Sequence, residues 1–123
     1  MKRQRMTPRE VMTALRRKVY TVDLSTGAVT RTATGRVVTP YLKKGGRKLI
    51  RLYVAGKVKA MHVARLVWMA GAGRTIPKGF EVHHRDDDSS SDAWDNLICL
   101  HRLDHHKVHA ADPSNVYAED IPY

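Results

Sequence analysis

The histidines of this chain are concentrated in its last third. Six of the seven lie between residues 83 and 109: His83, His84, His101, His105, His106 and His109. A neutral imidazole near pH 7 can accept a proton, and it is also a common ligand of transition metals. The clustering therefore indicates a site that combines proton transfer with metal binding; the alternative is a set of separate surface histidines.

The spacing of these histidines suggests different roles for them. His105 and His109 are four residues apart in a stretch that fits a helix, Leu103–Ala111, so both side chains would project from one face. His83 and His84 end a predicted short strand, in which successive side chains face opposite sides of the sheet. One member of that pair can then face a metal while the other faces a substrate.

A site made of His83, His105 and His109 would hold one divalent metal ion through imidazole nitrogens. Such ligands suit a transition metal such as zinc, nickel, manganese or cobalt better than magnesium, although magnesium stays open as an alternative. Three protein ligands and an open position are typical of a catalytic metal site, since structural zinc sites usually close with four.

The same segment resembles the HNH, or ββα-metal, nuclease motif, in which a strand pair and a helix hold one metal ion. The three letters of the motif are matched by His84, Asn96 and His105. The spacing from Asn96 through His105 to His109 is also similar to that of colicin-type nuclease domains. The resemblance implies metal-dependent hydrolysis of phosphodiester bonds.

The resemblance also implies a role for each residue. His84 would be the general base that activates water, and Asn96 would brace the loop and orient His84. His83, His105 and His109 would bind the metal, which would stabilise the departing 3′ oxygen. The expected reaction is cleavage of DNA that leaves a 5′-phosphate, by nicking or by cutting both strands.

Upstream of the motif, the chain is similar to the HNH homing endonucleases of phages and introns. Residues 61–67 and the strand-rich stretch before them carry this similarity, which extends over about residues 19–110. Many homing members have Asp at the position of His83, and many continue into a separate DNA-reading module. We therefore expect this chain to differ from them in metal preference and to have limited sequence preference.

The net charge of +10 is divided unevenly along the chain. Residues 1–80 have 19 Lys and Arg against two acidic residues, whereas residues 81–123 have three against ten. Basic side chains that neutralise phosphates release condensed counterions, so this front half indicates DNA as the partner. A basic surface that serves only solubility is the alternative. The arginines that we expect to contact DNA are Arg16, Arg17, Arg65 and Arg85.

Local patterns predict the elements that position the site. Residues 7–10 (Thr-Pro-Arg-Glu) have the pattern of a capping box that begins a helix. Residues 19–32 contain two β-rich runs around Ser-Thr-Gly, as in a hairpin. Apolar residues recur at helical spacing over residues 63–70, and short strands are expected at residues 80–82 and 97–100.

These patterns together predict an α+β fold, with a ββα-metal core preceded by a small antiparallel sheet and helices. The expected parts are a basic N-terminal helix (1–18), a strand-rich basic DNA-binding part (19–80), the HNH catalytic core (81–112) and an acidic tail (113–123). The single cysteine, Cys99, lies in an apolar run and is expected in the core.

No apolar run in the sequence reaches membrane-spanning length, and no apolar signal-peptide core follows the basic start. We therefore expect a cytoplasmic protein of a bacterial host cell, encoded by the host or by a phage, without membrane contact. The oligomeric state stays open, because cutting both strands with one site needs a dimer or two sequential nicks.

Two other functions fit the same residues. The chain could be a non-catalytic DNA-binding module in which the metal only stabilises the fold, or a colicin-like nuclease toxin. Replacement of His84 separates the first alternative from a nuclease, and toxicity on expression without a partner protein would support the second.

Overall fold

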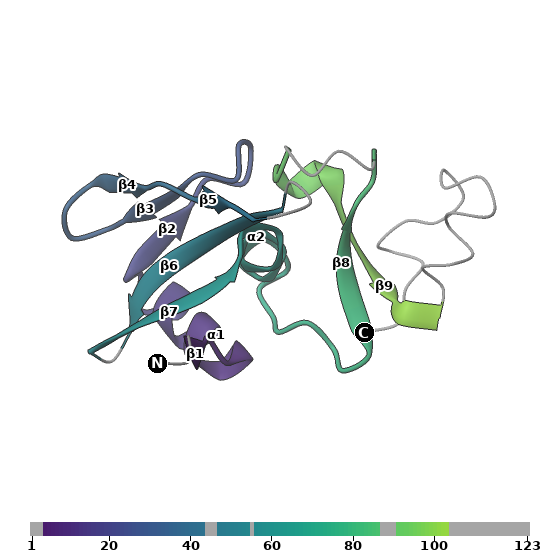
Figure 1. Cartoon of the computed structure of the whole chain (residues 1–123), viewed down its shortest axis with the longest axis horizontal. Helices are drawn as coiled ribbons and strands as arrows, with labels where there is room; N and C mark the ends of the chain where they lie inside the picture. Colours follow the sequence, from purple (N-terminus) through teal and green to yellow (C-terminus); the bar gives the residue numbers. More distant parts are fainter. Residues whose placement is uncertain (1–3, 44–46, 55, 87–90, 104–123) are drawn as a thin grey trace.

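The computed structural model describes residues 4–43, 47–54, 56–86 and 91–103. Within these ranges the chain forms two α-helices and three small β-sheets, which confirms the α+β prediction (Figure 1). None of the described helices is long and apolar enough to cross a membrane. Most of the expected helix over Leu103–Ala111, and the whole acidic tail, lie outside the described residues.

Helix α1 (Pro8–Arg16) begins at the predicted capping box. The backbone N–H of Glu10 donates to the Thr7 hydroxyl at 3.2 Å, and the Glu10 carboxylate accepts from the Thr7 N–H at 3.0 Å. Two amide groups that the first turn leaves without helical partners are therefore satisfied. The buried face of α1 consists of Val11, Met12 and Ala14.

Two sheets make up the basic front part. The three-stranded sheet has the order β2 (Tyr20–Val22), β3 (Val29–Arg31) and β4 (Arg36–Val38). The four-stranded sheet has the order β1 (Gln4–Arg5), β7 (Lys57–His62), β6 (Lys48–Val54) and β5 (Tyr41–Leu42). All neighbours are antiparallel except β1, which runs parallel to β7. The Tyr20 hydroxyl accepts a hydrogen bond from the Tyr53 N–H at 2.8 Å and so links the two sheets.

The predicted hairpin corresponds to β2 and β3, and strands β4, β6 and β7 lie within residues 19–80, which were expected to be rich in strands. Strands β1 and β5 were not expected, because each has only two residues and neither has a periodic pattern of its own. Both are strands only because β7 and β6 offer them a partner.

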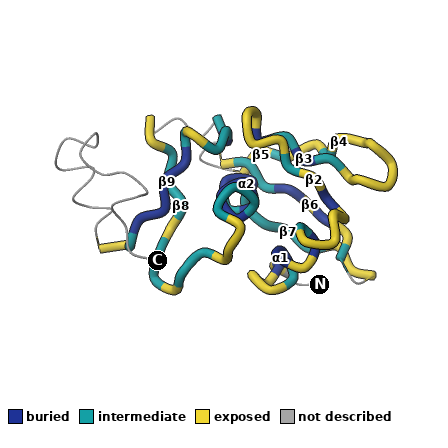
Figure 2. The backbone as a smooth tube through the Cα atoms, turned by 180° about the vertical axis from the view of Figure 1, so that it is seen from behind, coloured by how far each residue is buried: buried dark blue, intermediate teal, exposed yellow. Residues whose placement is uncertain are grey.

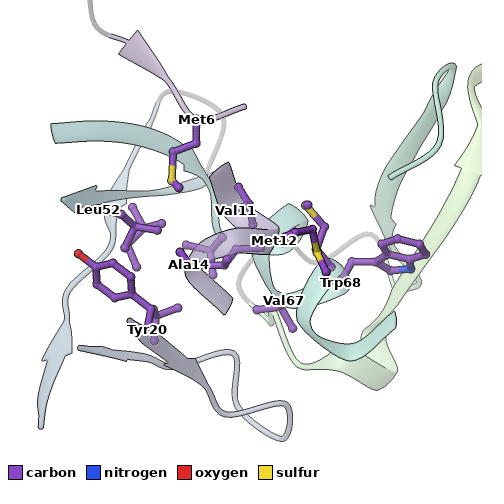
Figure 3. Packing of buried hydrophobic residues seen from close by; sticks show 14 of the residues in the cluster. Met6, Val11, Met12, Ala14, Tyr20, Leu52, Val67 and Trp68 are labelled. Carbon is purple, nitrogen blue, oxygen red and sulfur yellow. The ribbon is translucent and has the colours of Figure 1, made fainter. Parts of the chain in front are cut away.

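Helix α2 (Val63–Ala72) is the centre of the molecule, with the front sheets on one side and the β8–β9 hairpin on the other (Figure 1). Trp68 and Val67 are fully buried on it, and Leu52 of β6 is buried in the same core (Figure 3). The helix ends at Gly73, whose φ of 69° is in the left-handed region that favours glycine.

The last described elements are β8 (Phe80–His84), the short 3₁₀ helix η1 (Trp94–Asn96) and β9 (Leu97–His101). Strand β8 extends through both histidines and pairs antiparallel with β9, so that His83 lies opposite Ile98 and His84 opposite Leu97. Burial is deepest along β9 (Figure 2). Cys99 is fully buried, as predicted, and burial raises the pKa of its thiol to about 11.

Candidate active site

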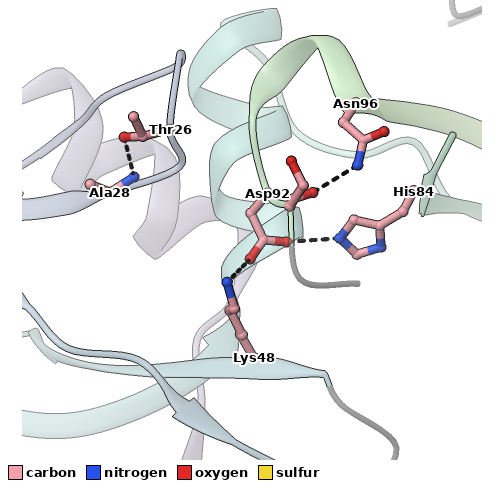
Figure 4. Close-up of polar contacts among 7 residues, drawn as sticks. Thr26, Ala28, Lys48, His84, Asp92 and Asn96 are labelled. Carbon is pink, nitrogen blue, oxygen red and sulfur yellow. Dashed lines mark hydrogen bonds and ion pairs between the residues drawn. The ribbon is translucent and has the colours of Figure 1, made fainter. Parts of the chain in front are cut away.

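His84 is the last residue of β8, directly before the segment that connects β8 to β9. Its side chain is 17% exposed, and its Nε2 atom is 2.8 Å from Oδ1 of Asp92 (Figure 4). A contact of this length between a ring nitrogen and a carboxylate oxygen is a hydrogen bond with good geometry. The ring therefore has a fixed partner on one side while part of it remains accessible to solvent.

Asp92 is the one charged residue among the buried residues that the structure describes, at 4% exposed. Its second carboxylate oxygen, Oδ2, is 3.9 Å from Nζ of Lys48 on β6 (Figure 4). A buried carboxylate needs partners of this kind, because an uncompensated charge is costly to remove from water. The contacts of Asp92 join the front sheet to the β8–β9 hairpin at the position of His84.

The backbone around Asp92 is in close contact with the turn between β2 and β3. Gly27, in the β2–β3 turn, has φ +80°, and a Cβ atom at this position would lie 2.7 Å from the Asp92 carbonyl oxygen. Two residues further on, the Trp94 N–H donates to the Leu24 carbonyl at 2.8 Å. The β2–β3 turn thus sets the position of the segment that carries Asp92.

The hydrogen bond to Asp92 has a consequence for the chemistry of His84. A carboxylate accepts hydrogen bonds, so the Nε2 atom of His84 carries the proton in this contact, and the lone pair of a neutral ring is then on Nδ1. His84 is in this way presented as a proton acceptor through Nδ1. Asp92 was not among the predicted site residues, because its burial depends on contacts with distant segments of the chain rather than on a local sequence pattern.

Asn96 ties together the two ends of the segment between the strands. Its Nδ2 atom donates to the Ser91 carbonyl at 2.9 Å and to the Asp86 carboxylate at 3.1 Å. Its backbone carbonyl accepts from the Arg85 N–H at 2.7 Å. These contacts are of the kind that a brace for the loop requires. The hydrogen-bond partner of the His84 ring is Asp92, which accepts from it, rather than Asn96.

His83 directly precedes His84 in β8. It is half-buried, and its Nε2 atom is shielded from solvent. It offers one nitrogen donor of the type that transition metals prefer. The other two predicted ligands, His105 and His109, lie outside the described residues. Within residues 4–43, 47–54, 56–86 and 91–103, no group of three or more His, Cys, Asp or Glu is placed to hold a metal. The three-histidine site therefore stays a prediction.

Comparison with known protein families gives a match over residues 61–107, which fit the model of an HNH endonuclease family. Over this segment the chain is similar to the HNH endonucleases. The match begins in β7, includes α2 and the whole β8–β9 hairpin, and contains His84, Asp92 and Asn96. Comparison with curated proteins gives no significant match.

Among solved structures, the HNH homing endonuclease I-HmuI is similar to this chain, with a TM-score of 0.61 and 21% sequence identity. The similarity covers 82% of this chain and 56% of that one, so the chain corresponds to little more than half of I-HmuI. The shared fold thus includes much of the front part as well as the HNH segment. That structure was described as showing DNA binding and cleavage by I-HmuI.

Of the four arginines that were expected to contact DNA, one lies next to His84 in the sequence and the other three lie in or beside the helices. Arg85 is exposed and directly follows His84. Arg65 is half-buried in the first turn of α2, whereas Arg16 and Arg17 are exposed at the end of α1. Arg85 is the one that adjoins β8 in sequence, whereas Arg65 belongs to α2 and Arg16 and Arg17 lie at the end of α1.

Proposed function

We propose that this chain is a metal-dependent DNA endonuclease that hydrolyses phosphodiester bonds and leaves 5′-phosphate ends. The observation that carries the proposal is the Asp92–His84 contact at the end of β8, inside the segment that matches the HNH endonucleases. A histidine with a buried carboxylate partner and a partly accessible ring is suited to take a proton from water. The basic front half supplies the charge that a DNA substrate requires.

In the proposed reaction, Nδ1 of His84 accepts a proton from the attacking water. The Asp92 carboxylate keeps the ring in the required tautomer and stabilises the imidazolium that forms. Asn96 holds Asp86 and Ser91 through its side-chain amide, and the exposed Arg85 side chain binds the phosphate. A divalent ion held by His83, His105 and His109 would supply electrostatic stabilisation of the departing 3′ oxygen.

Plasmid cleavage by the wild-type chain and by His84→Ala tests this proposal. The assay is run with Mg²⁺, Mn²⁺, Ni²⁺, Co²⁺ and Zn²⁺ in turn, and nicked and linear products are separated on a gel. General-base catalysis contributes about 10²- to 10⁴-fold, so we expect His84→Ala to lose activity by that factor with the best metal. His101→Gln is the control, because the His101 ring packs edge-on against Phe80 with centroids 5.3 Å apart.

The same assay distinguishes the alternatives. Equal cleavage by wild type and His84→Ala, with metal still bound, would show that His84 is not the base. Metal and DNA binding by the wild type without cleavage under any of the five ions would favour a non-catalytic DNA-binding module. Growth arrest of cells that express the wild type but not His84→Ala would favour a toxin.

A further inference from the structure

A basic cavity of about 450 Å³ is lined by residues of β1, β6 and β7, the segment around β5 and the helices α1 and α2, and by none of the β8–β9 hairpin. Its apolar walls include Leu49 and Met61. Four nitrogen-bearing side chains also line it: Arg5 from β1, Lys43 just after β5, His62 at the end of β7, and Arg65 from α2. No acidic residue is among the described residues that line this cavity.

His62 is half-buried and lies at the junction of two elements. It is the last residue of β7, lies opposite Leu49 of β6, and precedes the first turn of α2 without capping it through its side chain. Burial lowers the pKa of His62, and the positive charges of Arg47, Arg65, Lys43 and Arg5 lower it further. The neutral form of the ring is thus favoured while the cavity holds only cations.

The other titratable groups near the cavity do not offset this charge. Tyr41 lines the cavity from β5, and its ring lies 4.4 Å below the guanidinium carbon of Arg51. The acidic residue of α1, Glu10, is bonded to Lys59 at 2.6 Å and to Thr7. A cavity with three permanent cations and no carboxylate of its own attracts an anion, and its size accommodates a nucleotide-sized group.

We propose that this cavity binds a backbone phosphate of the nucleic acid, with Arg5, Lys43 and Arg65 as its cationic ligands and His62 as a hydrogen-bond donor. The proposal rests on the proposed function, because it takes DNA as the source of the phosphate. The phosphate reverses the sign of the local potential, so His62 gains a proton as the complex forms. Binding is therefore tighter at low pH, and the gain is lost as the pH rises through the pKa of His62 in the complex.

The cavity and the site of His84 are separate. Along β6, successive side chains alternate between the two faces of the sheet. Leu49 lines the cavity, whereas its neighbour Lys48 contacts Asp92. Variants of His62 and Arg65 thus probe phosphate binding without replacing a residue of the proposed catalytic site.

The direct test is NMR of the histidine rings of the full chain, with the His62 signals assigned from His62→Gln. Inorganic phosphate and a 20-base-pair duplex are added separately, under conditions in which the cleavage assay shows the duplex to stay intact. We expect both to shift the His62 signals and to raise its pKa. A shift with phosphate but not with the duplex would overturn the assignment to the DNA backbone, and no shift with either would overturn the cavity as an anion site.

Duplex binding at pH 6 and pH 8 gives an independent measurement. A rise of one unit in the pKa of His62 makes binding tighter by at most about tenfold, a limit that is reached as the pH falls below the pKa of His62 in the free protein. We expect His62→Gln to lose this part of the pH dependence, and Arg65→Gln to bind about tenfold more weakly with a smaller salt dependence. The control is Arg36→Gln, an exposed arginine on β4 in the other sheet, which should keep the pH dependence of the wild type.

The outcomes also separate this proposal from the nuclease proposal. Backbone amide spectra establish that each variant is folded before its binding is compared. If the wild type fails to cleave plasmid but the duplex still raises the pKa of His62, the nuclease proposal fails and the cavity proposal stands. If the wild type cleaves and His62→Gln keeps the full pH dependence of binding, the cavity proposal is the one that is wrong.

Discussion

At the scale of single residues, the carboxylate of Asp92 is unusual because it is buried and also has charged or polar partners on both sides. It is almost completely buried, yet it contacts a histidine of the proposed catalytic site on one side and approaches Lys48 on the other. Removing a carboxylate from water is unfavourable, so a position of this kind persists only where the partners compensate for it. We infer that Asp92 is a positioning residue for His84.

The substitution Asp92→Asn tests this inference. The amide keeps the size of the side chain and can still accept one hydrogen bond, but the negative charge that stabilises the imidazolium is lost. We expect kcat for plasmid cleavage to fall by about 10²-fold with little change in KM. Asp95→Asn, at an exposed position of η1, is the control. A fall in the unfolding temperature with unchanged kcat in the folded enzyme would instead assign Asp92 a purely structural role.

At the scale of elements, α2 and the segment between β8 and β9 are held together by close packing around Trp94. A Cβ atom at Gly71 would lie 2.2 to 2.6 Å from atoms of the Trp94 ring. The centroids of Trp68 and Trp94 are 6.2 Å apart, which places both rings in one cluster. Glycine is required at residue 71 because the ring occupies the space of a side chain.

We therefore expect Gly71→Ala to lower the free energy of unfolding by about 1 to 3 kcal/mol, as overpacking usually does. Chemical denaturation monitored by circular dichroism measures the change. In the background of Trp94→Leu, which removes the ring, the same substitution should cost much less. Equal costs in the two backgrounds would mean that the contact with Trp94 is not the cause.

A second element contact joins α1 to β7 through Glu10 and Lys59, whose charged atoms are 2.6 Å apart. The hydrogen bond from Lys59, helped by those from Thr7, lowers the pKa of Glu10 to about 2. Because this pKa is depressed in the folded state, the stabilising contribution is present above the unfolded value near 4.5 and is lost as the pH falls toward 2.

Thermal unfolding of wild type and Glu10→Gln from pH 6 to pH 2 tests this contact. The wild type should be the more stable protein at pH 6, and the two unfolding temperatures should converge as Glu10 becomes protonated. A difference that stays constant down to pH 2 would contradict the role of the ionised carboxylate. Lys59→Met should remove the same pH-dependent difference.

At the scale of the whole molecule, charge is separated along the chain, with the Lys and Arg residues concentrated in the first 80 residues. Arg51 is an exposed member of this set on β6, stacked over Tyr41, and Arg102 is exposed just after β9 in the acidic half. If the front half binds the phosphate backbone, affinity for DNA should fall steeply with salt.

Duplex binding measured from 50 to 200 mM salt tests this arrangement. With six or more phosphate contacts, the affinity should fall by about 10³-fold or more over that range. Arg51→Glu should weaken binding and flatten the salt dependence more than Arg102→Glu does. Equal effects of the two charge reversals would show that the front half is not the main DNA-binding surface.

The sequence by itself was enough for features that depend on neighbouring residues. The capping box of α1, the β2–β3 hairpin, the periodicity of α2 and the strand that ends at His83 and His84 all depend on groups a few residues apart. Such interactions are local, so their patterns are visible in the order of the residues. The HNH resemblance is of the same kind, because its residues lie within one short segment.

Contacts between distant segments were decided only by the tertiary structure. Strand β1 exists because β7 offers an edge more than fifty residues away, and Asp92 is a partner of His84 because Gly27 and Lys48 hold it from the front sheets. Acidic residues in a polar loop look alike in a sequence; burial among specific partners distinguishes Asp92 from Asp95. That burial depends on how three separate segments pack, and no local pattern encodes it.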